Sequence, residues 1–191
     1  DLVINGNKIG TVKRIKAIAA FDADKKTASF SSRGPGSRTT AGSPDQYKDY
    51  PQKPDESGMG VNLVAPVPKG SVVSELGGPG ASMSGTSMSN PGVFGGFMLL
   101  TRGILVLAKD LLPVMPAAQL NRFVMDLARY SMTQTAEKVA GPNEVGDGFI
   151  NIQAAYDHAV KLLKDNAPAP VKWAVRFHNL MRSIFGFAPL S

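Results

Sequence analysis

The segment Ser84-Gly-Thr-Ser-Met-Ser-Asn-Pro91 places a serine among small residues, directly before an apolar stretch. A glycine-flanked serine on a tight turn can expose its hydroxyl, and a following helix N-terminus directs unpaired N–H groups and partial positive charge towards an oxyanion. These are the requirements of acyl transfer, with Ser87 as the nucleophile. A serine at a helix start is also the usual N-cap. Spacing alone therefore favours a cap at Ser87.

The apolar stretch after this segment predicts a helix. Pro91 is expected to begin it, because the fixed φ of proline suits the first turn and its missing N–H costs nothing there. The helix is predicted to reach about Lys109, and its apolar residues on nearly all sides predict burial in a domain core. We do not expect it to span a membrane, because Thr101-Arg-Gly103 interrupts a run shorter than the ~20 residues that a bilayer needs.

Short strands and turns are predicted upstream of Ser87. Residues 1–20 alternate apolar and polar side chains around Asn5-Gly6, which favours a hairpin turn, and residues 15–20 are predicted to form a strand. Further strands are predicted over 61–65 and 71–76. The glycines and proline of 77–80 are expected to form a flexible approach to the serine segment.

Residues 35–60 contain many Pro, Gly, Ser and Asp residues and predict a long surface loop. One interpretation of its acidic residues is a calcium site; these residues are Asp45, Asp49, Asp55 and Glu56. They lack the alternate-residue spacing that arranges oxygens around one ion. We therefore expect a solvated loop, with no metal and no cofactor.

Downstream of Ser87, apolar residues recur at helical spacing over 116–132 and 151–164, which predicts two amphipathic helices. Residues 1–165 are expected to form one domain portion, and 166–191 a proline-containing linker followed by an amphipathic basic helix. That last helix is predicted to dock on its own domain or to open the next one. Binding to a membrane surface is the alternative.

Composition excludes several classes of function. The chain has 191 residues, 43% hydrophobic residues, a formal charge of +6 and no cysteine. It has no basic run interleaved with aromatic residues, so a nucleic-acid partner is not expected. The absence of cysteine removes disulfides and a cysteine nucleophile. The N-terminus lacks an initiator Met and a signal-peptide pattern, so we expect the chain to begin inside a larger protein.

Several segments together resemble the subtilisin-like serine proteases, or subtilases. Gly85-Thr-Ser-Met88 with Pro91 matches the G-T-S-M-x-x-P motif around the family's nucleophile, which favours Ser87 as a nucleophile over a cap. The other matching segments, in chain order, are Ala28-Ser-Phe-Ser-Ser-Arg-Gly-Pro35, Lys53-Pro-Asp55, Gly60-Val-Asn62, Ala65-Pro66 and Gly148-Phe-Ile-Asn-Ile-Gln-Ala-Ala155. The resemblance covers roughly residues 15–160 and implies an α/β fold, the C-terminal part of a three-layer arrangement with a mostly parallel sheet between helices.

The sequence also departs from the family pattern. Gly92 replaces a common histidine, Val67 replaces a glycine, and the loop before Gly60 is longer than in compact subtilisins. These features are closer to the larger tripeptidyl-peptidase II-like and plant-type subtilases.

The resemblance also implies that the rest of the catalytic triad lies elsewhere. The family order is Asp, His, Ser, so the acid and the base are expected N-terminal to residue 1. The two histidines, His158 and His178, are predicted to be exposed surface residues rather than the base. Asn7 is a candidate for the oxyanion asparagine, although Asn5-Gly6 is equally consistent with a hairpin turn.

The resemblance predicts a serine peptidase that cleaves peptides or proteins through an acyl-enzyme on Ser87. The expected partner is an N-terminal segment, or a separate chain of a nicked enzyme, that supplies Asp and His. A non-catalytic binding or regulatory module that retains the serine turn is the alternative. Most members of the family are secreted, so a secreted or extracytoplasmic location is expected.

Overall fold

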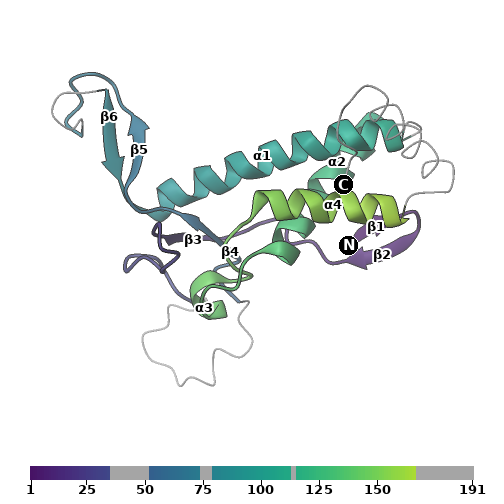
Figure 1. The fold of residues 1–191 in the computed structure, drawn as a ribbon, viewed down its shortest axis with the longest axis horizontal. Coiled ribbons are helices and arrows are strands. Elements are labelled where there is room, and N and C mark those ends of the chain that lie inside the picture. Colours follow the sequence, from purple (N-terminus) through teal and green to yellow (C-terminus); the bar gives the residue numbers. More distant parts are fainter. Residues whose placement is uncertain (35–51, 74–78, 113–114, 167–191) are drawn as a thin grey trace, which may run out of the picture. The chain divides into compact units, whose positions relative to one another are not determined.

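The computed structural model describes residues 1–34, 52–73, 79–112 and 115–166. The chain divides into two compact units, each built from separated stretches of sequence (Figure 1). Unit 1 comprises residues 1–14, 96–135 and the described residues from 151 onwards, and unit 2 comprises residues 15–95 and 136–150. The predicted tail over 167–191 lies outside the described residues.

Unit 1 begins with an antiparallel hairpin of β1 (Leu2–Ile4) and β2 (Asn7–Gly10). Its turn has Asn5 at φ 50° and Gly6 at φ 80°, the left-handed values that a two-residue hairpin turn requires. The buried side chains at both ends of β1 alternate with the exposed Val3. The predicted hairpin is confirmed.

Three helices complete unit 1: the later part of α1 (Thr86–Leu111), α2 (Ala117–Thr135) and α4 (Ile152–Asn166). The last two confirm the helices predicted over 116–132 and 151–164. They pack on each other along the faces that carry their periodic apolar residues. The buried residues of the three helices in this unit include Leu100, Ile104, Leu120, Val124, Leu127, Ala155, Ala159, Val160 and Leu163.

The start of α1 differs from the prediction. The helix begins at Thr86 and has Pro91 inside it, whereas the sequence predicted Pro91 as the first helical residue. Proline removes one backbone N–H near a helix start but does not prevent the turns before it from forming. The serine segment is therefore helical from Thr86 onwards, and only Ser84 and Gly85 form a turn before the helix.

The predicted burial of α1 on nearly all sides is also wrong. Met98, Leu99 and Val106 are between 51% and 73% exposed, so one side of the helix in unit 1 is apolar and open among the described residues. The helix continues through Thr101, Arg102 and Gly103, which agrees with its predicted extent to about Lys109. In the part of the chain that the structure describes, Thr86–Lys109 is long and apolar enough, by length and composition, to cross a membrane.

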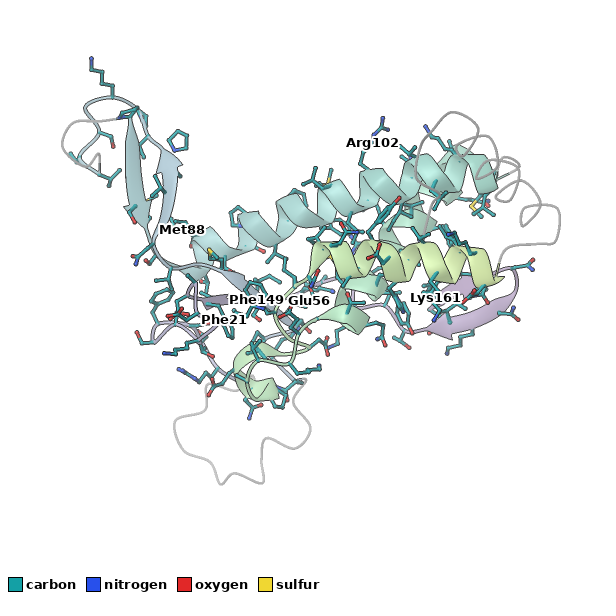
Figure 2. All side chains as sticks on the ribbon, in the orientation of Figure 1. Phe21, Glu56, Met88, Arg102, Phe149 and Lys161 are labelled. Carbon is teal, nitrogen blue, oxygen red and sulfur yellow. The ribbon has the colours of Figure 1, made fainter. Side chains whose placement is uncertain are left out.

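Unit 2 is centred on a parallel pair of strands, β3 (Ile18–Phe21) and β4 (Glu56–Met59). The fully buried Phe21 meets the ring of Phe149 edge-on, with 6.1 Å between ring centroids (Figure 2). The short helix α3 (Pro142–Val145) contributes a buried valine to the same core. A strand is predicted over 15–20, whereas β3 spans Ile18–Phe21. Ile15 is exposed and lies outside the strand.

A second hairpin in unit 2 joins β5 (Leu63–Pro66) to β6 (Gly80–Met83). β5 overlaps the strand predicted over 61–65, but it begins at Leu63 and ends at Pro66. The strand predicted over 71–76 is wrong in its described part, where Val72 and Val73 lie in a turn. The second strand forms at Gly80, which the sequence predicted as a flexible approach, because its backbone pairs with Pro66.

Strand β4 lies inside the predicted surface loop over 35–60, so that part of the prediction is wrong. Asp55 and Glu56 are 2% and 0% exposed rather than solvated. Asp55 pairs with Lys53 and accepts the Ala17 N–H at 2.7 Å, and Glu56 pairs with Lys16. These ion pairs allow Asp55, just before β4, and Glu56, its first residue, to be buried. The other two acids of the suggested calcium site, Asp45 and Asp49, lie outside the described residues.

The α/β class is confirmed. The described residues contain three strand pairs, of which β3–β4 is parallel and the two hairpins are antiparallel. A parallel bridge between Ser57 and Phe149 extends the central pair. The mostly parallel sheet implied by the resemblance is thus not contained in the described residues.

Candidate active site

Ser87 is the second residue of α1, and its side chain is exposed. The carbonyl of Gly85 accepts the N–H groups of Met88 at 3.0 Å and Ser89 at 3.2 Å, so Gly85 occupies the N-cap position. Ser87 lies inside the first turn and is not the cap. The N–H groups of Thr86 and Ser87 precede the first hydrogen bonds of the helix and have no acceptor within it.

The turn before Ser87 is held by backbone hydrogen bonds within unit 2. The N–H of Gly85 donates to the carbonyl of Gly60 at 2.7 Å, and the N–H of Gly60 donates to the carbonyl of Phe21 at 2.8 Å. One further bond comes from the first turn of α1, where the buried Ser89 hydroxyl donates to the Ala19 carbonyl at 2.8 Å. The helix start is therefore fixed to the central strands.

Gly60 is required by the close packing at this junction. A Cβ at this position would lie 2.7 Å from the Gly85 carbonyl oxygen, 2.8 Å from the Ala20 Cβ and 2.9 Å from the Ser89 Cβ. All three are backbone or Cβ atoms, which cannot rotate away. Only a residue without a side chain lets the strand end approach the serine turn this closely.

The side chain of Ser84 also stabilises the turn before Ser87. Its hydroxyl accepts the backbone N–H of Asn62 at 2.8 Å and lies 3.4 Å from the Asn62 side-chain oxygen. Asn62 has a φ of 54°, a left-handed value that asparagine tolerates. This contact holds the chain on the other side of Gly85. Ser84 and Ser89 thus use their hydroxyls for structure, and the exposed Ser87 stands between them.

The electrostatics at Ser87 favour a negative charge. The helix N-terminus carries a partial positive charge, and the first turn of α1 contains no acidic residue that would oppose an oxyanion. Oriented N–H groups at such a position can stabilise the tetrahedral intermediate of acyl transfer. Figure 2 shows Met88, the neighbour of Ser87, at the start of the helix.

His158 differs from the predicted exposed surface histidine. It is half-buried in unit 1, where its Nδ1 lies 3.1 Å from the Oγ of the fully buried Ser131 and its ring packs against Tyr130. Burial, with a smaller contribution from Lys161, holds the pKa of His158 below its usual range. Helical periodicity correctly puts His158 on the polar side of α4, but α2 covers part of that side and buries the ring. His178 lies outside the described residues.

Asn7 pairs with Ile4 in the hairpin of unit 1. The turn interpretation of Asn5-Gly6 is therefore confirmed, and the oxyanion role of Asn7 stays a prediction. The contacts that sequence reasoning missed are those of Ser89, Ser84 and Gly60. The sequence feature that could have indicated these contacts is the pattern of small residues around the G-T-S-M motif.

Comparison with known proteins relates the chain to subtilisin-like proteases. No family model matches it. It is 29% identical over 152 residues to the Arabidopsis thaliana subtilisin-like protease SBT3.9, a match that covers 75% of this chain and 18% of the relative. The solved structure of the prenylagaramide maturation protease PagA superposes on 78% of this chain with a TM-score of 0.50 and 20% identity, and the match covers 43% of PagA.

These matches define what is common to the proteins. The structural likeness shows a shared fold, and the sequence match supports a relationship to subtilisin-like proteases. The chain spans about a fifth of the curated relative and less than half of the solved structure that it matches.

Proposed function

We propose that this protein is a serine peptidase whose nucleophile is Ser87. The observation that carries the proposal is the environment of Ser87: an exposed hydroxyl at the second residue of α1, beside helix N–H groups that have no acceptor within the helix. The sequence match to a subtilisin-like protease supports the same chemistry. The substrate class that follows is peptides or proteins.

The proposed reaction proceeds through an acyl-enzyme. The Ser87 Oγ attacks the scissile carbonyl carbon while a histidine removes its proton, and the Ser87 N–H stabilises the resulting oxyanion. The histidine then protonates the leaving amine as the carbon–nitrogen bond breaks. Water adds to the acyl carbon and gives up its proton to the same histidine, and the carboxylic acid leaves as Ser87 recovers its proton.

The histidine and its aspartate are proposed to come from a segment N-terminal to residue 1, or from a separate chain bound to this one. His158 is the one histidine among the described residues, and it is bound to Ser131 in unit 1. The fraction of the relatives' length that the chain spans leaves room for such a segment.

The open side of α1 is the surface that we propose this segment covers. Met98, Leu99 and Val106 lie on it in unit 1, at 51%, 73% and 52% exposure. Contiguous exposed apolar side chains mark interaction surfaces. A membrane is the competing occupant, and the exposed Arg102 in the middle of this side opposes that alternative (Figure 2). A location outside the cytoplasm is part of the proposal.

The test is hydrolysis of a fluorogenic peptide library by the complete protein, with every chain that copurifies. Ser87→Ala is expected to lower kcat by about 10⁶-fold, the loss that accompanies removal of the subtilisin nucleophile. Ser71→Ala, a serine of the β5–β6 connection, is the control and should retain full activity. Equal activity of the Ser87→Ala protein would contradict the proposal. Absence of hydrolysis by the unmutated, folded protein would favour the non-catalytic module.

A further inference from the structure

A second concave site lies in unit 1, formed by α2 and the chain that follows β2. Its volume is about 470 Å³, within the usual range of ligand pockets. It is lined by three arginines and one aspartate, with two apolar side chains beside them: Arg14, Arg122, Arg129, Asp126, Ala118 and Met125. We call this site the arginine groove.

The charges of the arginine groove do not balance. Arg14 binds Asp126 with two hydrogen bonds, Nε to Oδ1 at 3.2 Å and Nη2 to Oδ2 at 2.8 Å. Arg129 adds a contact from its Nη1 to Oδ1 at 3.4 Å. The lining of the groove thus carries three guanidinium groups beside one carboxylate.

Asp126 is fixed in its charged form. Its side chain is 8% exposed. Burial alone would raise the pKa of Asp126, but the hydrogen bonds and charge of Arg14, with the charges of Arg129 and Arg122, hold that pKa below its usual range. The carboxylate therefore serves to position arginines and does not need an external cation.

Two of the arginines are preorganised. Arg14 uses two of its five N–H donors for Asp126, and its side chain remains half exposed. Arg129 also lies over the ring of Phe97, at 4.9 Å from the centroid. Guanidinium groups held in this way lose little entropy when they bind a carboxylate, and their planar forks match its geometry.

Arg122 supplies the remaining charge. It is exposed on α2, one turn before Asp126, and the ion pairs found among the described residues do not include it. Ala118 and Met125 provide an apolar wall beside the charges. A ligand that fits has a carboxylate next to an apolar group. A second copy of this chain does not fit by charge, because each copy carries a net +6.

We propose that the arginine groove binds an acidic peptide segment in which carboxylate side chains alternate with apolar ones. This site is independent of Ser87 and of the proposed hydrolysis. It would give the protein an affinity for acidic stretches of a protein partner or substrate, through contacts outside the region of the serine turn.

The test measures binding of a fluorescently labelled (Glu-Leu)₄ peptide by anisotropy, using the complete protein in its Ser87→Ala form so that the peptide is not cleaved. We expect saturable binding below about 1 mM. Affinity should fall when salt is raised from about 50 to about 300 mM, because the contacts are charge-based. The same peptide with Gln in place of Glu, and inorganic phosphate at equal concentration, should bind at least about tenfold more weakly.

Matched variants locate the site. Arg122→Gln is expected to weaken binding by about five- to tenfold, because it removes one guanidinium charge of the groove without breaking the hydrogen bonds to Asp126. Lys161→Gln removes an exposed positive charge of α4 in the same unit, outside both proposed surfaces, and should leave affinity unchanged. Circular dichroism verifies that both variants are folded. Equal affinities of these two variants, equal binding of the Gln peptide or of phosphate, or no saturable binding would each overturn the proposal.

Discussion

Two serines in the first turn of α1 have opposite environments. Ser87 is exposed, whereas Ser89 is fully buried and donates its hydroxyl to the Ala19 carbonyl at 2.8 Å. The buried hydroxyl fixes the helix to strand β3, and the exposed one is the proposed nucleophile. The same substitution at the two positions therefore separates the structural bond from the proposed catalytic role.

Ser89→Ala is predicted to lower the free energy of unfolding by about 1–3 kcal/mol, because it leaves the buried Ala19 carbonyl without this donor. Ser87→Ala makes the same chemical change at an exposed position and should alter stability by less than about 0.5 kcal/mol. Urea denaturation followed by circular dichroism measures both. A Ser89→Ala protein as stable as the Ser87→Ala protein would show that this bond does not anchor the helix.

His158 predicts a pH dependence of stability. Its pKa is lowered in the folded protein, chiefly by burial, so the unfolded chain binds more protons as the pH falls. The stabilising contribution is complete above the unfolded pKa of about 6.5 and is lost as the pH falls through the folded value. His158→Gln should flatten the change in unfolding free energy between about pH 7.5 and about pH 5. Identical pH profiles for the two proteins would be inconsistent with this account.

At the residue scale, the sequence singled out Ser87 as the candidate nucleophile, but it did not predict the environment of the acids. The G-T-S-M motif is long enough to single out one serine. Asp55 and Glu56 were predicted to be solvated because acidic residues beside Pro and Gly usually are. Lys16, the partner of Glu56, is distant in sequence, so this pairing depends on the tertiary fold.

At the scale of elements, the junction of β4, β5 and α1 depends on small residues. Gly60→Ala is predicted to destabilise the protein by about 1–3 kcal/mol, because its Cβ would meet the Gly85 carbonyl oxygen at 2.7 Å. It should also impair hydrolysis by displacing the serine turn. Gly95→Ala in α1 meets nothing within 4 Å and should stabilise the isolated chain by about 0.5–1 kcal/mol. Thermal unfolding of both variants measures the difference, and a shift of the same sign in both would refute the packing argument.

Long periodic elements were predictable and short ones were not. α2 and α4 repeat apolar residues over several turns, which gives a clear signal. β4 and β6 have four residues each, and their pairing partners are set by contacts that the local sequence does not contain. The start of α1 was missed because its first turns hold Ser, Gly and Pro, which are weak helix formers stabilised here by the anchor to β3.

At the scale of the whole molecule, α1 has an open apolar side, which we propose is covered by the segment that supplies the histidine. Leu99→Lys is predicted to weaken association with the chain or segment that supplies the histidine, because it places a charge at a 73% exposed apolar position. Val72→Lys, at a fully exposed position of the β5–β6 connection, should leave association unchanged. Native mass spectrometry of the copurified protein reports the difference. Equal association of the two variants would rule out this side of α1 as the contact surface.

The division into two discontinuous units could not be predicted from the sequence. Unit 1 joins residues 1–14 to helices more than 80 residues later, and no local pattern encodes that contact. Arg14 and Asp126 illustrate this, since they are 112 positions apart. The pattern of apolar and polar residues indicates which face of each element is apolar. The surface that this face packs against is determined by the tertiary structure.

The most direct test of the central claim is covalent labelling of the complete native protein with a fluorophosphonate probe, followed by mapping of the modified residue by mass spectrometry. Such a probe reacts with a serine that a histidine activates. We predict one adduct, on the Ser87 Oγ, and no adduct in the Ser87→Ala protein. A folded, fully assembled protein that forms no adduct, or an adduct on another serine, would contradict the assignment of Ser87 as the nucleophile.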